Sequence, residues 1–132
     1  NWSQTAVHKC TRWRYYIGIM TIVLLERSKA GVLLSCKAEG HAGFAKSGSD
    51  IVCSAITVLI RTTMQVLSET DGVKLKADTT NRGFLSFCVT VDSFSEKTET
   101  VLSYAGDFLE TGLKSLMNEF PEYVEVRTKR VW

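Results

Sequence analysis

The residues best suited to chemistry lie in one short segment, residues 40–55, which reads GHAGFAKSGSDIVCSA. His41 stands near its start and Cys53 follows twelve residues later, and His41 is the only histidine after residue 19. A cysteine thiolate is the nucleophile of cysteine hydrolases, and a neighbouring imidazole holds and transfers the proton. One histidine and one cysteine without paired ligand spacing do not make a zinc site, so no metal is expected. The pair is therefore a candidate for the dyad of a thiol hydrolase.

The same two residues also have a plain structural interpretation. A cysteine early in an amphipathic helix is more often a small buried hydrophobic residue than a nucleophile, and a lone histidine in a loop is usually only solvated. Spacing alone leaves both interpretations open. Cys36 and Cys88 lie in strand patterns and are expected to pack in the interior. A serine hydrolase with a G-x-S-x-G element is excluded, because the sequence contains none.

A helix must position the cysteine. Apolar residues recur at helical spacing over residues 52–67, and Asp71-Gly72 ends the pattern. Asp50 is a good N-cap residue, which would place Cys53 in the first helical turn. There the free N–H groups and the helix dipole favour an anion, so the thiol is expected to ionise readily.

The segment between the two residues is expected to be a substrate loop. Gly40, Gly43 and Gly48 lower the cost of rearrangement, and no apolar periodicity anchors residues 42–49. Phe44 is the one large apolar residue there, and we expect it to contact substrate or cover the closed site. The loop would bring its two ends, with the histidine and the cysteine, close together.

The rest of the chain alternates between strand and helix patterns. Strands are predicted at residues 21–26, 32–38, 73–78, 84–91 and 123–128, with helices at 52–67 and 98–116. The order ββαββαβ predicts an α+β fold, a two-layer sandwich in which both helices pack on one face of a mixed, mainly antiparallel sheet. The other, open face of the sheet is expected to carry aliphatic residues, Leu33 and Leu24 or Ile22, which favour a homodimer.

Composition limits the class of protein. The 132 residues suit one domain, and residues 1–19 carry three basic residues and no acid, whereas the remainder holds 13 basic and 14 acidic residues. We expect residues 1–19 to be a non-native or upstream leader and residues 20–132 to be the single domain. The alternative, a secretory signal cleaved after Ala30, would destroy the first strand. A body without excess positive charge gives no reason to expect a nucleic-acid partner.

The apolar runs and the cysteine spacing predict a cytoplasmic protein without a membrane anchor. No uninterrupted apolar run approaches the ~20 residues of a membrane helix, so no membrane association is expected. The four cysteines show no framework-like spacing, which favours free thiols in a reducing cytoplasm.

The motif resembles that of a known family. Gly40-His41-Ala42, then Gly48, then Asp50-Ile51-Val52-Cys53-Ser54-Ala55 is similar to the signature of the ribosomal-processing cysteine protease family (Prp). The resemblance implies a cytoplasmic, homodimeric bacterial endopeptidase, and no cofactor is expected. Its substrate would be the N-terminal extension of large-subunit ribosomal protein number twenty-seven, cut after a pair of phenylalanines.

The resemblance assigns roles to individual residues. His41 matches the family's base, Cys53 its nucleophile, and Asp50 the aspartate of the motif, which we interpret as helix cap and site organiser. Ser54 and Thr57 stand where alanine and serine are commoner, and both changes are conservative in size. The competing hypothesis is a non-catalytic ribosome-assembly or peptide-binding factor that keeps the motif for folding or docking.

Overall fold

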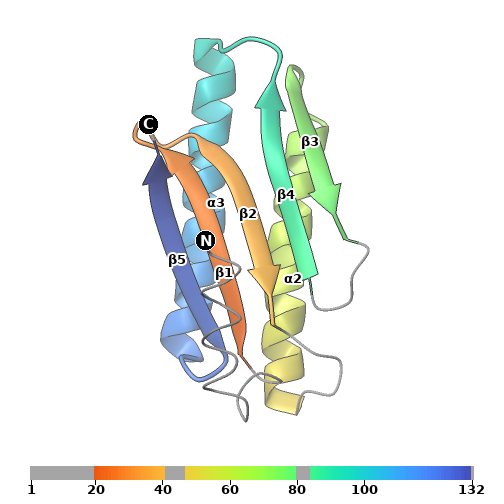
Figure 1. The fold of residues 1–132 in the computed structure, drawn as a ribbon, viewed down its shortest axis with the longest axis vertical. Coiled ribbons are helices and arrows are strands. Elements are labelled where there is room, and N and C mark those ends of the chain that lie inside the picture. Colours follow the sequence, from red (N-terminus) through yellow and green to blue (C-terminus); the bar gives the residue numbers. More distant parts are fainter. Residues whose placement is uncertain (1–19, 41–46, 80–83, 132) are drawn as a thin grey trace.

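The computed structural model describes residues 20–40, 47–79 and 84–131. Along the chain it contains β1 (Thr21–Ser28), β2 (Leu33–Glu39), α2 (Ser47–Ser68), β3 (Val73–Asp78), β4 (Phe84–Val91), α3 (Glu96–Glu119) and β5 (Val124–Val131). The sheet order is β3-β4-β2-β1-β5. Among the described strands, the β1–β5 pair is parallel and the other three pairs are antiparallel. Figure 1 shows both helices on one face of the sheet, which confirms the predicted α+β sandwich.

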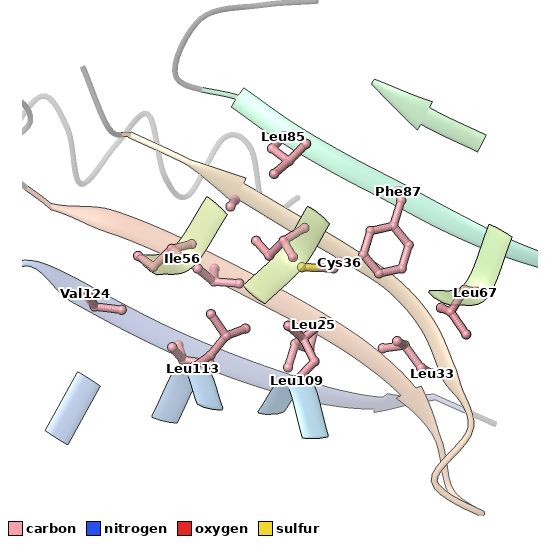
Figure 2. Close-up of a cluster of buried hydrophobic side chains, with 14 of the residues drawn as sticks. Leu25, Leu33, Cys36, Ile56, Leu67, Leu85, Phe87, Leu109, Leu113 and Val124 are labelled. Carbon is pink, nitrogen blue, oxygen red and sulfur yellow. The ribbon is translucent and has the colours of Figure 1, made fainter. Parts of the chain in front are cut away.

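The core lies between the two layers. Figure 2 shows Leu25 of β1 and Cys36 of β2 in one cluster with Ile56 of α2 and Leu109 of α3, and each of these side chains is at most 2% exposed. Burying one such aliphatic side chain contributes about 1.5–3 kcal/mol. This packing fixes both helices over the sheet, and with them any side chain at the end of a helix.

One β-bulge changes which residues of β2 face the core. Glu26 pairs with Ser35, but the next residue, Arg27, pairs with Leu33, so Leu34 has no partner in the register. The extra residue reverses the alternation of sides. Leu33 is fully buried for this reason, although the unbroken alternation predicted that it would lie on the open face.

The first strand is longer than the predicted residues 21–26, because Arg27 and Ser28 belong to β1 rather than to the turn between the two strands. Arg27 is only 3% exposed and faces α3, where it donates hydrogen bonds to Asp107 and Glu110, both at 2.7 Å. Its guanidinium also reaches the carbonyls of Gly31 and Ser103. A buried charge is tolerated only when it is paired in this way.

The pKa values of this cluster reflect the pairing. Burial by itself would lower the pKa of Arg27, but its bonds to Asp107 and Glu110 outweigh burial and raise that pKa. Burial would likewise raise the pKa of Glu110, but hydrogen bonds from Lys114, Arg27 and Thr128 bring it down to about 2. The carboxylate is therefore held ionised and joins β1, β5 and α3.

The second helix of the pattern, α3, is well capped. Ser95 has extended backbone angles, and its side chain accepts a hydrogen bond from the Thr98 amide at 3.1 Å. Glu96 and Glu99 place negative charge in the first turn, where the helix dipole favours it. The helix ends at Glu119, two residues before Pro121, which cannot continue a helix.

The helix α2 is apolar over much of its length. Its stretch Ile51–Ser68 has a mean hydropathy of 1.6 and, by length and composition alone, could cross a membrane. The count of uninterrupted apolar residues missed this stretch because polar residues interrupt it. In the fold, α2 packs against α3 and β3. The core helix of a soluble protein can have the same length and hydropathy, so this single helix is weak evidence for a membrane span.

Candidate active site

The helix that carries Cys53 begins earlier than predicted. It starts at Ser47, so Asp50 lies inside the helix and the assignment of Asp50 as its N-cap is wrong. Cys53 is consequently the seventh residue of α2 and lies beyond the first turn. The free N–H groups belong to the first four residues, and the dipole effect falls off within that turn. Ionisation of Cys53 by the helix end alone is therefore a weaker explanation than the sequence suggested.

Cys53 lies on the side of α2 that faces the sheet. It is half-buried, and its Sγ is 3.6 Å from Oγ1 of Thr21, the first residue of β1. Thr21 is fully buried, and its amide donates to the carbonyl of Tyr123 at 2.8 Å where β5 begins. The start of β1 thus forms the floor beneath the thiol.

Gly40 allows the end of β2 to pack against the start of β1, next to Thr21. Its φ is +105°, a left-handed conformation that favours glycine, and a Cβ there would lie 2.6 Å from the carbonyl oxygen of Met20. Backbone contact this close leaves no room for a side chain. The chain therefore leaves β2 directly beside the residue that precedes Thr21, at the end of the sheet where Cys53 lies.

The remaining motif residues divide into two groups. His41, Gly43 and Phe44 lie outside the described residues, so their assignments stay predictions. Gly48 lies in α2 rather than in a loop, and the expected loop over residues 42–49 is wrong at its C-terminal end because the helix takes up residues 47–49.

The other described cysteines differ from Cys53 and from each other. Cys36 is 1% exposed, and burial raises the pKa of its thiol to about 12, which confirms that it is a packing residue. Cys88 is exposed, so its assignment as a packing residue is wrong. It pairs with Ser35 across β2 and β4 and lies on the sheet face opposite the helices, whereas its neighbour Phe87 is in the core.

A hollow of about 540 Å³ opens at the start of α3, lined by Phe94, Tyr104 and acidic side chains. In Figure 1 the start of α3 lies at the opposite end of the helical layer from the start of α2. None of its lining residues belongs to the motif. Position and composition both separate it from the candidate active site.

The sequence did not identify Thr21. A threonine at the start of a strand carries no signal of a site, since threonine is common in strands for its backbone preference. Only the packing of α2 over β1 shows that its hydroxyl reaches the thiol. In the described part of the site, the half-exposed thiol of Cys53 therefore lies against the buried hydroxyl of Thr21. The end of β2, which His41 follows in the sequence, is beside them.

Solved structures show the same fold. SMU.848 from Streptococcus mutans is 25% identical, with a TM-score of 0.69, and the match covers 86% of this chain and 97% of that one. The essential ribosomal processing protease Prp from S. aureus in complex with a substrate peptide is 16% identical, with a TM-score of 0.67, covering 83% and 100%. The same enzyme in complex with a covalently linked product peptide is 18% identical, with a TM-score of 0.65, and the match covers 83% of this chain and 100% of that one.

No curated protein matches the chain. The model of the family described as cysteine protease Prp, however, matches residues 20–125, which is most of the sequence and includes every element up to the first residues of β5. On this match the chain belongs to the cysteine protease Prp family and is a cysteine protease.

Proposed function

We propose that the chain is the endopeptidase that removes the N-terminal extension of bacterial large-subunit ribosomal protein number twenty-seven. The observation that carries this proposal is the position of Cys53, half-exposed on α2 at the end of the sheet where β2 leads into His41. The solved S. aureus relative of the same fold is a ribosomal processing protease that was seen with a substrate peptide. The enzyme is proposed to act in the cytoplasm as a homodimer, without cofactor or metal.

The proposed chemistry uses two residues. His41 takes the proton of Cys53, and the thiolate attacks the scissile carbonyl carbon. When the tetrahedral intermediate collapses, the C–N bond breaks and the imidazolium gives its proton to the departing amine. Water, deprotonated by His41, then attacks the resulting thioester, which releases the new C-terminal carboxylate and restores the thiol.

Cleavage of a synthetic peptide tests the proposal. The peptide carries a Phe-Phe pair ahead of the scissile bond, and a matched peptide carries Ala-Ala instead. We expect the full chain to cut only the first peptide, directly after the pair, as read by mass spectrometry. Cys53→Ala and His41→Ala should each lower kcat at least about a thousandfold.

Cys88→Ser is the matched control, because it removes an exposed thiol on the opposite face of the sheet. It should cleave as fast as the parent chain. Full activity of Cys53→Ala would overturn the proposal. Binding of the peptide without cleavage by the parent chain would instead support the peptide-binding factor.

A further inference from the structure

The hydroxyl of Thr21 is a buried polar group with one partner. Thr21 is 0% exposed, and Oγ1 lies 3.6 Å from Cys53 Sγ. Within residues 20–40, 47–79 and 84–131 no other hydrogen bond of this hydroxyl is seen. Buried hydroxyls are nearly always paired, so the contact with sulfur satisfies this one.

The position of the hydroxyl is fixed from several sides. The amide of Thr21 bonds to Tyr123, and the residue is in register with Val124 in the parallel pair. On the other side of β1, Gly40 packs against the Met20 carbonyl and the Thr21 Cα. Because a β-branched side chain has few χ1 rotamers, Oγ1 has little freedom to move away.

The direction of the hydrogen bond depends on the state of sulfur. When Cys53 is a thiol, either atom can donate. When Cys53 is a thiolate, sulfur has no proton, so only the Thr21 hydroxyl can donate. A hydrogen bond to the charged form favours that form, and bonds to ionised acceptors are stronger than neutral ones.

We propose that Thr21 is a positioning residue for Cys53, whose hydroxyl donates to the thiolate, stabilises it and fixes the direction of Sγ. The inference rests on the proposed role of Cys53 as nucleophile. It also replaces part of the stabilisation that the helix end cannot give to a residue beyond its first turn.

The titratable groups on the strands beside Thr21 follow from burial and from the alternation of sides. Thr21, Val23 and Ala38, at this end of β1 and β2, are uncharged and buried. Glu39 follows Ala38 on β2 and therefore lies on the opposite face of the sheet. The titratable groups of the motif itself are His41 and Asp50, and both are unchanged in the variants below.

The test compares Thr21→Val, which keeps the shape and removes the hydroxyl, with Thr21→Ser, which keeps the hydroxyl. Both are made in the full chain carrying Cys10→Ser and Cys88→Ser. The two cysteines that remain are Cys53 and Cys36, and Cys36 is buried. Iodoacetamide alkylation of Cys53 is followed by peptide mapping from pH 5 to pH 10. Cleavage of the Phe-Phe peptide gives kcat and KM.

Thr63→Val is the matched control. Thr63 is 4% exposed, and its hydroxyl donates to the carbonyl of Leu59 at 2.9 Å, so the change removes a buried hydroxyl from the same helix. It lies ten residues from Cys53, which is about 15 Å along the helix axis. Any general effect of losing a buried hydroxyl appears in this variant too.

We expect Thr21→Val to slow alkylation about tenfold at neutral pH and to shift the midpoint of the rate profile to higher pH. At high pH, where the thiol is ionised in every variant, the rates should converge. kcat should fall with little change in KM, Thr21→Ser should restore both profiles, and Thr63→Val should match the parent.

Three outcomes would overturn the inference. Thr21→Val could leave the alkylation profile unchanged, it could slow alkylation equally at every pH, as altered access would, or Thr21→Ser could fail to rescue. These outcomes leave the proposed function intact as long as Cys53→Ala is inactive. Cleavage by Cys53→Ala would instead refute the proposed function itself.

Discussion

Gly106→Ala should destabilise the protein although alanine is the better helix former. A Cβ at Gly106 would lie 2.8 Å from Nε of Arg27 and 2.9 Å from its Cζ and Nη2. These distances are shorter than any ordinary contact. The guanidinium cannot move aside without losing bonds, because Asp107, Glu110 and two carbonyls hold it.

The magnitude follows from two opposing effects. Replacing glycine by alanine inside a helix contributes about 1 kcal/mol in favour of folding. Disrupting a buried, paired charge costs about 3–5 kcal/mol. The free energy of unfolding should therefore fall by roughly 2–4 kcal/mol.

Urea unfolding at pH 7, followed by circular dichroism, measures the effect. Gly112→Ala is the matched control in the same helix. Its Cβ would meet only side-chain carbons of Leu59, at 3.1 and 3.2 Å, and a leucine side chain can shift by a few tenths of an ångström. This control should unfold within about 1 kcal/mol of the parent chain.

A double-mutant cycle decides whether Arg27 is the cause. With Arg27→Ala in place the clash is gone, so adding Gly106→Ala should be neutral or stabilising by about 1 kcal/mol. If Gly106→Ala costs as much in that background as in the parent chain, the reasoning from the guanidinium contact is refuted.

Two further predictions concern Glu110 and Gly40. The pKa of Glu110 is lowered from 4.5 to about 2, so its ionised form stabilises the fold above pH 4.5, and this stability is lost as the pH falls toward 2. Glu110→Gln should therefore lower the free energy of unfolding by about 2–3 kcal/mol at pH 7 and by little near pH 2, as measured by urea unfolding at the two pH values. An equal loss of stability at both pH values would contradict this prediction. The control Asp107→Asn should lower the free energy of unfolding by less, because the Asp107 side chain is 67% exposed. Gly40→Ala should cost about 2 kcal/mol or more and slow peptide cleavage, because it combines positive φ with a 2.6 Å backbone contact. Gly72→Ala has a φ of +82° but no contact closer than 4.0 Å, so an equal loss there would show that the Met20 contact is unimportant.

Periodicity in the sequence was sufficient to predict the elements and the layers. Strand residues such as Val23 and Leu25 alternate with half-buried ones, and residues such as Leu102, Leu109 and Leu113 recur along one side of α3. These patterns reflect burial on one side, which is also what forms the core. Element order and the single-sided helical layer followed from them.

Features that depend on single backbone positions were not predictable in the same way. The bulge at Leu34 comes from the register between two strands. Arg27 was assigned to the turn that contains Gly31, but it is a buried strand residue, which is uncommon for a charged side chain. Its partners on α3 lie some eighty residues away in the chain. No local pattern reports a pairing over that distance.

The start of α2 shows how the same limit affects the candidate active site. Apolar periodicity begins where the helix meets the core, at Val52, but the helix itself begins at Ser47. Its first turn was therefore assigned to a loop, and Cys53 was placed at the helix end. With the helix start corrected, Cys53 lies beyond the free backbone amides of the first turn, and its Sγ is 3.6 Å from the Thr21 hydroxyl of β1. A motif can thus point to a candidate nucleophile, while the groups that surround its thiol depend on how the helix packs on the sheet.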